Sequence, residues 1–122
     1  YNESFANFVG ARGAEAFFRS RGDSVRAART ESRWDDERVL AAYWARLYGR
    51  LDSTFRAHPG DSLRALRIAL RDSLYSAARD ELRTSVAPRW KTIAPRYADV
   101  VRLDNASLLA RRVYLTDLEP FE

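Results

Sequence analysis

The sequence of 122 residues contains no cysteine, no methionine, a single histidine (His58) and a single lysine (Lys91). The absence of cysteine excludes disulfides, thiolate zinc sites and cysteine nucleophiles. A metal bound by this chain would therefore have oxygen or imidazole ligands. His58 stands in a His-Pro-Gly-Asp segment typical of a surface turn, without a second histidine or a cysteine to form a site.

Long apolar runs are absent as well. No stretch approaches the roughly 20 apolar residues needed to cross a bilayer, and no signal-like segment opens the chain. We therefore expect no transmembrane segment in these residues. Because methionine is absent and the opening Tyr1-Asn2-Glu3-Ser4 reads as the middle of an element, we also expect the native N-terminal region to be missing.

The composition is that of a folded globular protein, with 46% apolar and 31% charged residues. The net charge of +4 raises the question of nucleic-acid binding. The 21 basic residues are, however, interspersed with 17 acidic ones, and no recognition motif is present. We expect no nucleic-acid partner and a single helical domain over residues 1–122.

Helical periodicity runs through the chain, and no segment alternates as a strand, so the sequence predicts an all-α fold. Residues 3–19 form the first predicted helix. One face carries an apolar stripe, and a second face is small: the stripe is Phe5, Phe8, Val9, Ala16 and Phe17, and the small face is Glu3, Ala6, Gly10 and Gly13. Because glycine destabilises a helix interior by about 1 kcal/mol, we expect the small face to pack closely against a neighbouring helix.

A helical hairpin is predicted next. Gly22 and Asp23 suit a helix stop and restart, and residues 35–55 carry apolar side chains at intervals of three and four. A turn at residues 58–61, in which Asp61 or Ser62 can cap the following helix, leads into a second stripe over residues 63–86 that should pack antiparallel on the first.

Shorter packed helices complete the predicted fold. Prolines at 88 and 95 predict a broken or short helix over residues 90–101. Residues 105–114 should form another short helix, capped by Asp104 or Asn105. Most acidic residues alternate with arginine, as Asp80 does with Arg83, which is typical of a solvated helix face rather than of a paired-carboxylate enzyme.

Two strings at opposite ends of the chain carry a resemblance. The opening string Asn2-Glu3-Ser4-Phe5-Ala6 resembles the NESFA segment of bacterial zinc aminopeptidases of the gluzincin group. The closing string Leu103-Asp104-Asn105-Ala106, with Tyr114 and the Leu118-Glu119-Pro120-Phe121 tail, is similar to the end of the same family. Asp104 stands where the family pattern has Asn, and either residue can cap a helix.

The resemblance implies a zinc site completed by this chain. In that family the zinc is held by an HExxH helix and by a glutamate from a later helix, which would be Glu3 here. Asn2 would brace the ligand, Tyr114 would stabilise the oxyanion, and Asn105 would contact a peptide substrate. The fold implied is the helical C-terminal portion of a metallopeptidase. No HExxH occurs in these residues, so the chain alone should be inactive.

Other interpretations stay open. Glu3 can be an acidic first-turn residue favoured by the helix dipole, and the hairpin can be a helical protein-interaction module without catalysis. Members of the family resemble exported or lipid-anchored bacterial envelope proteins, so the resemblance implies the cell envelope or periplasm. The expected partners are a peptide substrate and the missing N-terminal part of the same protein.

Overall fold

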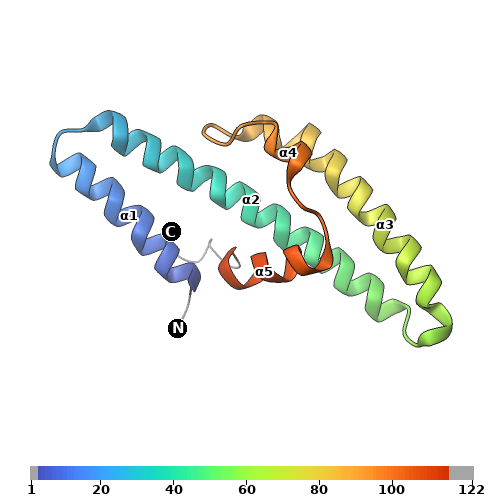
Figure 1. Ribbon diagram of the computed structural model, residues 1–122. Coiled ribbons are helices and arrows are strands. Elements are labelled where there is room, and N and C mark those ends of the chain that lie inside the picture. The colour runs from blue at the N-terminus through green and yellow to red at the C-terminus, as the bar shows by residue number, and fades with distance from the viewer. Residues whose placement is uncertain (1–2, 116–122) are drawn as a thin grey trace.

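The computed structural model describes residues 3–115, shown as a ribbon in Figure 1. Five α-helices lie in this range: α1 (Glu3–Ser20), α2 (Ser24–Ala57), α3 (Arg64–Glu81), α4 (Tyr97–Val100) and α5 (Asn105–Leu115). Short 3-10 turns at Asp61–Leu63 and Ala87–Arg89 flank α3 and a π-helical turn at Leu82–Val86. No residue from 3 to 115 is in a strand, so the predicted all-α class is confirmed.

The long helix α2 organises the fold. Helix α1 runs back along its first half, and α3 runs back along its second half (Figure 1). Helix α5 lies in the angle between them and contacts both α1 and α2. None of the described helices is long and apolar enough to cross a membrane.

The turn between α1 and α2 has the predicted stop and restart. Gly22 has φ 71°, a left-handed conformation that favours glycine, and its amide bonds the Arg19 carbonyl at 3.0 Å. The Asp23 carboxylate accepts from the Arg26 amide at 3.0 Å and so caps α2. The polar segment after this cap is continuous with the rest of α2, and its Ala27 is buried.

The predicted hairpin of α2 and α3 is present. The buried Tyr43 hydroxyl donates to the Ala78 carbonyl at 2.9 Å, and Glu81 accepts from Arg46 and Arg50 at 2.9 and 3.1 Å. The turn between the helices differs from the expectation, because no side chain caps the short Asp61–Leu63 helix. Gly60 enters that helix with φ 86°, and Arg67 donates to the Gly60 carbonyl at 2.6 Å.

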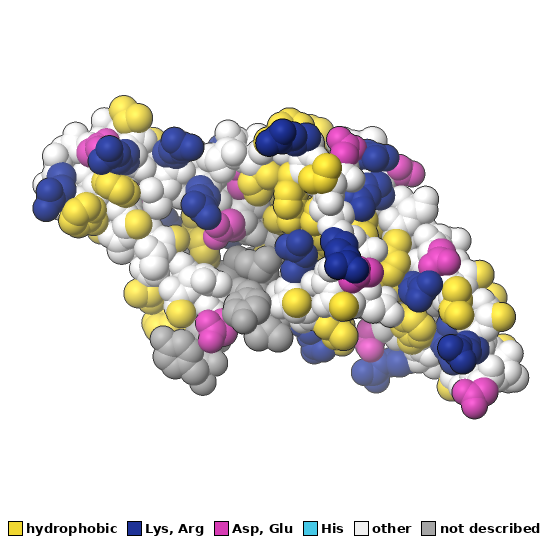
Figure 2. Space-filling view, viewed as in Figure 1, with side chains coloured by type: hydrophobic (Ala, Val, Ile, Leu, Met, Phe, Trp, Pro, Cys, Tyr) yellow, Lys and Arg dark blue, Asp and Glu magenta, His cyan; other side chains and the backbone are white. Residues whose placement is uncertain are grey.

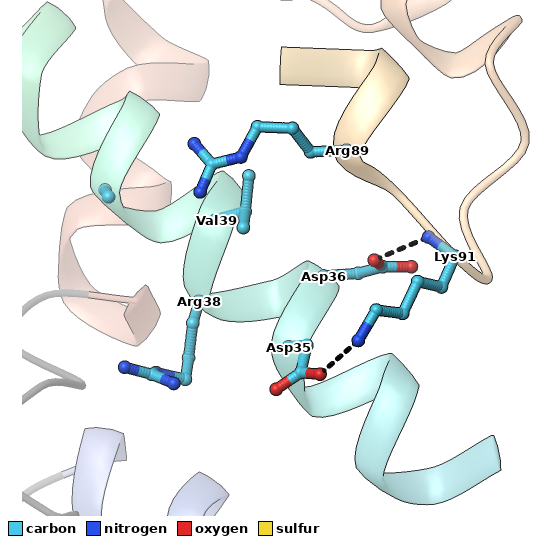
Figure 3. Close-up of a pocket in the computed structure, with 7 residues that line it drawn as sticks. Asp35, Asp36, Arg38, Val39, Arg89 and Lys91 are labelled. Carbon is cyan, nitrogen blue, oxygen red and sulfur yellow. Dashed lines mark hydrogen bonds and ion pairs between the residues drawn. The ribbon is translucent and has the colours of Figure 1, made fainter. Parts of the chain in front are cut away.

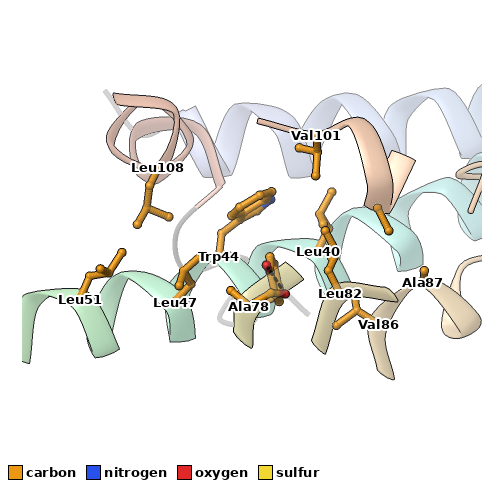
Figure 4. Close-up of a cluster of buried hydrophobic side chains, with 12 residues drawn as sticks. Leu40, Trp44, Leu47, Leu51, Ala78, Leu82, Val86, Ala87, Val101 and Leu108 are labelled. Carbon is orange, nitrogen blue, oxygen red and sulfur yellow. Dashed lines mark hydrogen bonds between the residues drawn. The ribbon is translucent and has the colours of Figure 1, made fainter. Parts of the chain in front are cut away.

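The main hydrophobic core lies where α2, the end of α3, the π-helical turn and α5 meet (Figure 4). The stripe predicted over residues 63–86 is only partly buried: Leu82 is 0% exposed, whereas Leu66 is 43% exposed. Leu66 lies about 120° around the helix from the buried Ala78, so it points away from α2. The buried members of the core are Leu40, Tyr43, Trp44, Leu47, Leu51, Ala78, Leu82, Val86, Ala87, Ala98, Val101 and Leu108.

A buried carboxylate ties α2 to the segment that follows Pro88. Asp36 is 1% exposed and accepts from the amides of Lys91, Thr92 and Ile93 at 2.8, 2.6 and 3.1 Å. The Thr92 hydroxyl donates a fourth bond at 2.7 Å. These four donors replace the solvation that Asp36 loses on burial, and they fix the path of the chain after α3 (Figure 3).

The segment after Pro88 is held by arginine and ends in α5. The Arg79 guanidinium donates to the carbonyls of Ala98 and Val101, both at 2.7 Å. Arg83 pairs with Asp99 at 2.7 Å rather than with its helical neighbour Asp80. Asp104 accepts from the Ser107 amide at 2.7 Å, which confirms the predicted cap of α5.

Candidate functional site

Glu3 begins α1 and its residue is exposed, whereas the following Ser4 is only 3% exposed. A carboxylate in the first turn of a helix is favoured by the helix dipole. Because it is open to its surroundings, the Glu3 carboxylate can reach a group outside α1 without breaking a buried interaction of its own helix. Asn2, the predicted brace of this site, lies outside the described residues.

Helix α1 packs on α2 through a different face from the one predicted. Phe8 and Ala11 pack against Trp34 and Ala41, with the Phe8 and Trp34 ring centroids 6.0 Å apart. The predicted apolar stripe was wrong for its other large members, since Phe5, Val9 and Phe17 are 51%, 49% and 52% exposed. Around the helix, Phe5 lies about 60° from Phe8 on the side away from Ala11, and Val9 and Phe17 lie about 100° and 180° from Phe8.

The side of α1 turned away from α2 carries no charge. At 100° per residue, an arc of about 140° contains only apolar, glycine and serine residues. The side of a helix that faces away from its packing partner is normally charged or polar, whereas this side of α1 is uncharged and largely apolar. We call this arc the outward face of α1; it consists of Phe5, Ala6, Val9, Gly10, Gly13, Ala16, Phe17 and Ser20.

One edge of the outward face opens into a groove between α1 and α2. The groove has a volume of about 350 Å³ and is lined by Ala6, Asn7, Gly10, Ala11, Ala14, Thr30, Arg33, Trp34 and Glu37. The close packing expected at the small face is absent from the described part of the chain, because a Cβ at Gly10 or Gly13 would meet no atom within 4 Å. Small residues here leave space instead of filling it.

Helix α5 brings the second predicted string beside α1. It contacts α1, and its backbone is helical through Tyr114. The side chain of Tyr114 lies outside the described residues. Asn105, the first residue of α5, accepts from the Tyr75 hydroxyl at 2.6 Å, so its amide oxygen has a structural partner. The fold therefore brings the helix of Glu3 into contact with the helix of Tyr114. Asn105 lies at the first residue of α5, and Tyr114 lies near its last.

The described residues hold no complete metal site. Between residues 3 and 115, no three His, Cys, Asp or Glu side chains are grouped closely enough to bind a metal ion. Glu3 can supply one oxygen ligand, and a structural or catalytic zinc ion needs at least three protein ligands. A zinc site that includes Glu3 thus requires ligands from beyond the described range.

Another opening lies over the buried Asp36 and has a volume of about 360 Å³ (Figure 3). Burial raises the pKa of Asp36, but bonds from Lys91, Thr92 and Ile93 outweigh it and hold the pKa below its ordinary value. Lys91 pairs with Asp35 at 2.7 Å, which raises the pKa of its ammonium group. Both groups stay charged at neutral pH, so neither suits proton transfer.

Sequence reasoning missed Asp36, although a signal for it was present. Asp36 stands four residues before Leu40 and seven before Tyr43, on the same stripe of α2. A carboxylate at such a position is buried and needs donors. Most other acidic residues of the chain alternate with arginine, and Asp36 was grouped with them as a solvated residue.

The sequence itself was compared with known proteins. The profile of the family described as "Putative aminopeptidase" matches residues 1–122, the whole chain. The chain belongs to this family. No curated protein and no solved structure matches it. The family match includes both strings of the predicted site, from Glu3 in α1 to Tyr114 in α5.

Proposed function

We propose that this chain is the helical C-terminal portion of a zinc-dependent aminopeptidase of the gluzincin type, and that Glu3 is its zinc ligand. The histidine ligands would come from an HExxH helix that precedes Tyr1 in the same polypeptide. The observation that carries the proposal is the family match over all 122 residues, which includes the helix that begins at Glu3.

The surface of α1 is consistent with this role. Its outward face is uncharged, and the adjoining groove is bordered by Ala6, Gly10 and Ala14, so another helix can approach the backbone closely. An HExxH helix presents two imidazoles on one face and needs a third ligand from a closely packed neighbour. Glu3 lies at the start of the helix that offers such a surface.

The position of α5 is consistent with the role proposed for Tyr114. Because α5 contacts α1, Tyr114 is carried on a helix that neighbours the helix of Glu3. A phenol near the reacting carbonyl can stabilise an oxyanion, and this is the role proposed for Tyr114. Asn105 would contact substrate, and its bond to Tyr75 would then orient its amide. Asn2, next to Glu3, would brace the ligand.

A zinc ion at such a site would supply Lewis acidity and an activated water for peptide hydrolysis. In this chain, the Glu3 carboxylate would bind the zinc ion. The packing of Phe8 on Trp34 would hold α1, and with it Glu3, in place. The general base would be the glutamate of HExxH, outside these residues. The chain without that motif would hydrolyse no peptide.

The direct test is release of the N-terminal residue from peptides by the polypeptide that carries both the motif and this chain. A free-amine peptide should be cleaved and its N-acetylated counterpart should not. Glu3→Gln should lower the rate at least a hundredfold, whereas Glu31→Gln, a change to another exposed glutamate, should leave it intact. A gene without HExxH shortly before Tyr1 would refute the proposal.

The second candidate is a helical interaction module. The exposed Phe5, Val9 and Phe17 favour it, since an uncharged helix face can bind a partner protein without any chemistry. On this reading Glu3 is a first-turn residue favoured by the helix dipole. Equal zinc affinity of the wild-type protein and the Glu3→Ala variant would favour the module.

A further inference from the structure

Several half-buried arginines of this chain bind oxygen acceptors. Arg12 and Arg71 each pair with a carboxylate, at 3.1 and 2.8 Å. Arg67 and Arg79 each donate to two backbone carbonyls, at 2.6 Å and 2.7 Å. On the face shown in Figure 2, basic and acidic side chains are likewise interspersed. At these four positions the fold supplies an acceptor to a guanidinium that is partly removed from water.

Arg111 in α5 is also half-buried, but it has no such acceptor in residues 3–115. Its guanidinium carbon lies 4.5 Å from the centroid of the Trp44 ring. The Arg111 Nε atom is shielded from solvent, and in the described range it makes no hydrogen bond. Contact with the ring offsets part of the cost of removing the charge from water. The ring offers no lone pair to the guanidinium N–H groups, so their need for an acceptor remains.

A second donor without an acceptor belongs to the same contact. Trp44 is 3% exposed, and its indole Nε1 is buried without a hydrogen bond to any residue from 3 to 115. In Figure 4 the Trp44 side chain projects from α2 toward the layer that contains Leu108 and Val101. Buried N–H groups without acceptors are uncommon in folded proteins. Two of them on side chains in contact favour an acceptor from outside the described residues.

The donors and their place in the fold favour a peptide carboxylate as that acceptor. A guanidinium binds a carboxylate through two parallel hydrogen bonds, and a peptide carries a carboxylate at its C-terminus. Arg111 precedes Tyr114 by one turn of α5, about 4.5 Å along the helix axis. An extended peptide advances roughly 3.3 Å per residue. A carboxylate at Arg111 would thus lie one or two residues from a carbonyl at Tyr114.

We propose that Arg111 binds the C-terminal carboxylate of short peptide substrates, with the Trp44 ring as its support. The proposal rests on the proposed function, in which Tyr114 lies at the reacting carbonyl. Dipeptides and tripeptides would place their carboxylate within reach of Arg111, so the enzyme would prefer them to longer peptides. Arg111 would bind substrate and would take no part in proton transfer.

The test compares peptide acids with peptide amides, using the polypeptide that carries both HExxH and this chain. A dipeptide should have a kcat/KM at least about tenfold above that of its C-terminal amide, mainly through a lower KM. Arg111→Met should lower kcat/KM for the acid about tenfold and change the amide less than about twofold, and Arg111→Lys should keep part of the preference. Arg64→Met, an exposed arginine on α3, should leave both substrates unchanged.

A measurement on this chain alone separates the proposal from the peptidase function. Acetate should shift the NMR signals of the Arg111 Nε–H and the Trp44 indole N–H, whereas neutral acetamide should shift neither. The Arg111 signal is assigned by its loss in Arg111→Lys. Shifts with acetate but no cleavage by the longer polypeptide would refute the peptidase function and support the carboxylate site. No shift with acetate would overturn the proposal. So would an equal loss for acid and amide in Arg111→Met, the result expected if the acceptor were a carboxylate of the upstream part.

Discussion

Replacement of Asp36 by alanine should be among the most destabilising single changes in this chain. Asp36 is 1% exposed and accepts four hydrogen bonds from Lys91, Thr92 and Ile93. Hydrogen bonds to a charged group contribute about 1.5–3 kcal/mol each, and they are not additive. Removal of the carboxylate also leaves three backbone amides without their acceptor. We expect a loss of about 3–5 kcal/mol in the free energy of unfolding.

The neighbouring Asp35 provides the control. Asp35 makes one ion pair, to the Lys91 ammonium at 2.7 Å, and its side chain is 39% exposed. Asp35→Ala should therefore cost less than about 1 kcal/mol. Urea unfolding at neutral pH measures both variants, and the midpoint of Asp36→Ala should fall by roughly 2 M. If the two variants differed by less than about 1 kcal/mol, the role assigned to Asp36 would be wrong.

Asp36 also predicts a dependence on pH. Its pKa is lowered in the folded state, so its contribution to stability is complete above the unfolded pKa of about 3.9. That contribution should be lost as the pH falls through the lower, folded pKa. The Asp36→Asn variant should lack this part of the acid-induced loss in urea midpoint, while Asp35→Asn should retain it.

The remaining predictions concern the hairpin, the segment after Pro88 and the outward face of α1. Arg79→Met removes two hydrogen bonds to the carbonyls of Ala98 and Val101, so the free energy of unfolding in urea should fall by about 2 kcal/mol. Arg83→Met is the control: the ion pair of Arg83 with Asp99 is exposed, and its loss should cost less than about 1 kcal/mol. Burial raises the pKa of Tyr43 to about 12, so absorbance titration should show one tyrosine that ionises near pH 12 and is missing in Tyr43→Phe. The contribution of buried Tyr43 to the free energy of unfolding should be complete below the unfolded pKa of about 10 and should be lost as the pH rises to about 12. Val9→Ser should change the stability of this chain by less than about 1 kcal/mol because the residue is half exposed. Phe8→Ser, which disrupts packing on Trp34, should cost more than about 2 kcal/mol.

Local patterns predicted much of the fold. Gly22 and Asp23 marked the end of one helix and the cap of the next, and Pro88 preceded a break, because these residues act through their own backbone. The stripe of α2 from Leu40 to Leu51 was predicted as a buried helix face and is one. Short-range chemistry of this kind can be read from a sequence without knowledge of neighbours.

Long-range contacts could not be predicted in the same way. Periodicity grouped Phe5, Phe8 and Val9 into one stripe, but only Phe8 packs on α2, because the rotation of α1 depends on Trp34 and Ala41 in its partner. The Asp36 bonds join residues more than 50 positions apart. For the candidate site, Glu3 and Tyr114 came from resemblance, and contact between α1 and α5 became visible only in the structure.

Zinc binding by the polypeptide that includes the HExxH motif tests the proposed function most directly. Competition titration with a chelator would give the affinity of the wild-type protein, of Glu3→Gln and of the Glu31→Gln control. We predict one zinc ion per polypeptide, an affinity at least about a hundredfold lower for Glu3→Gln, and no change for Glu31→Gln. Equal zinc affinity in all three proteins would contradict the assignment of Glu3 as a ligand.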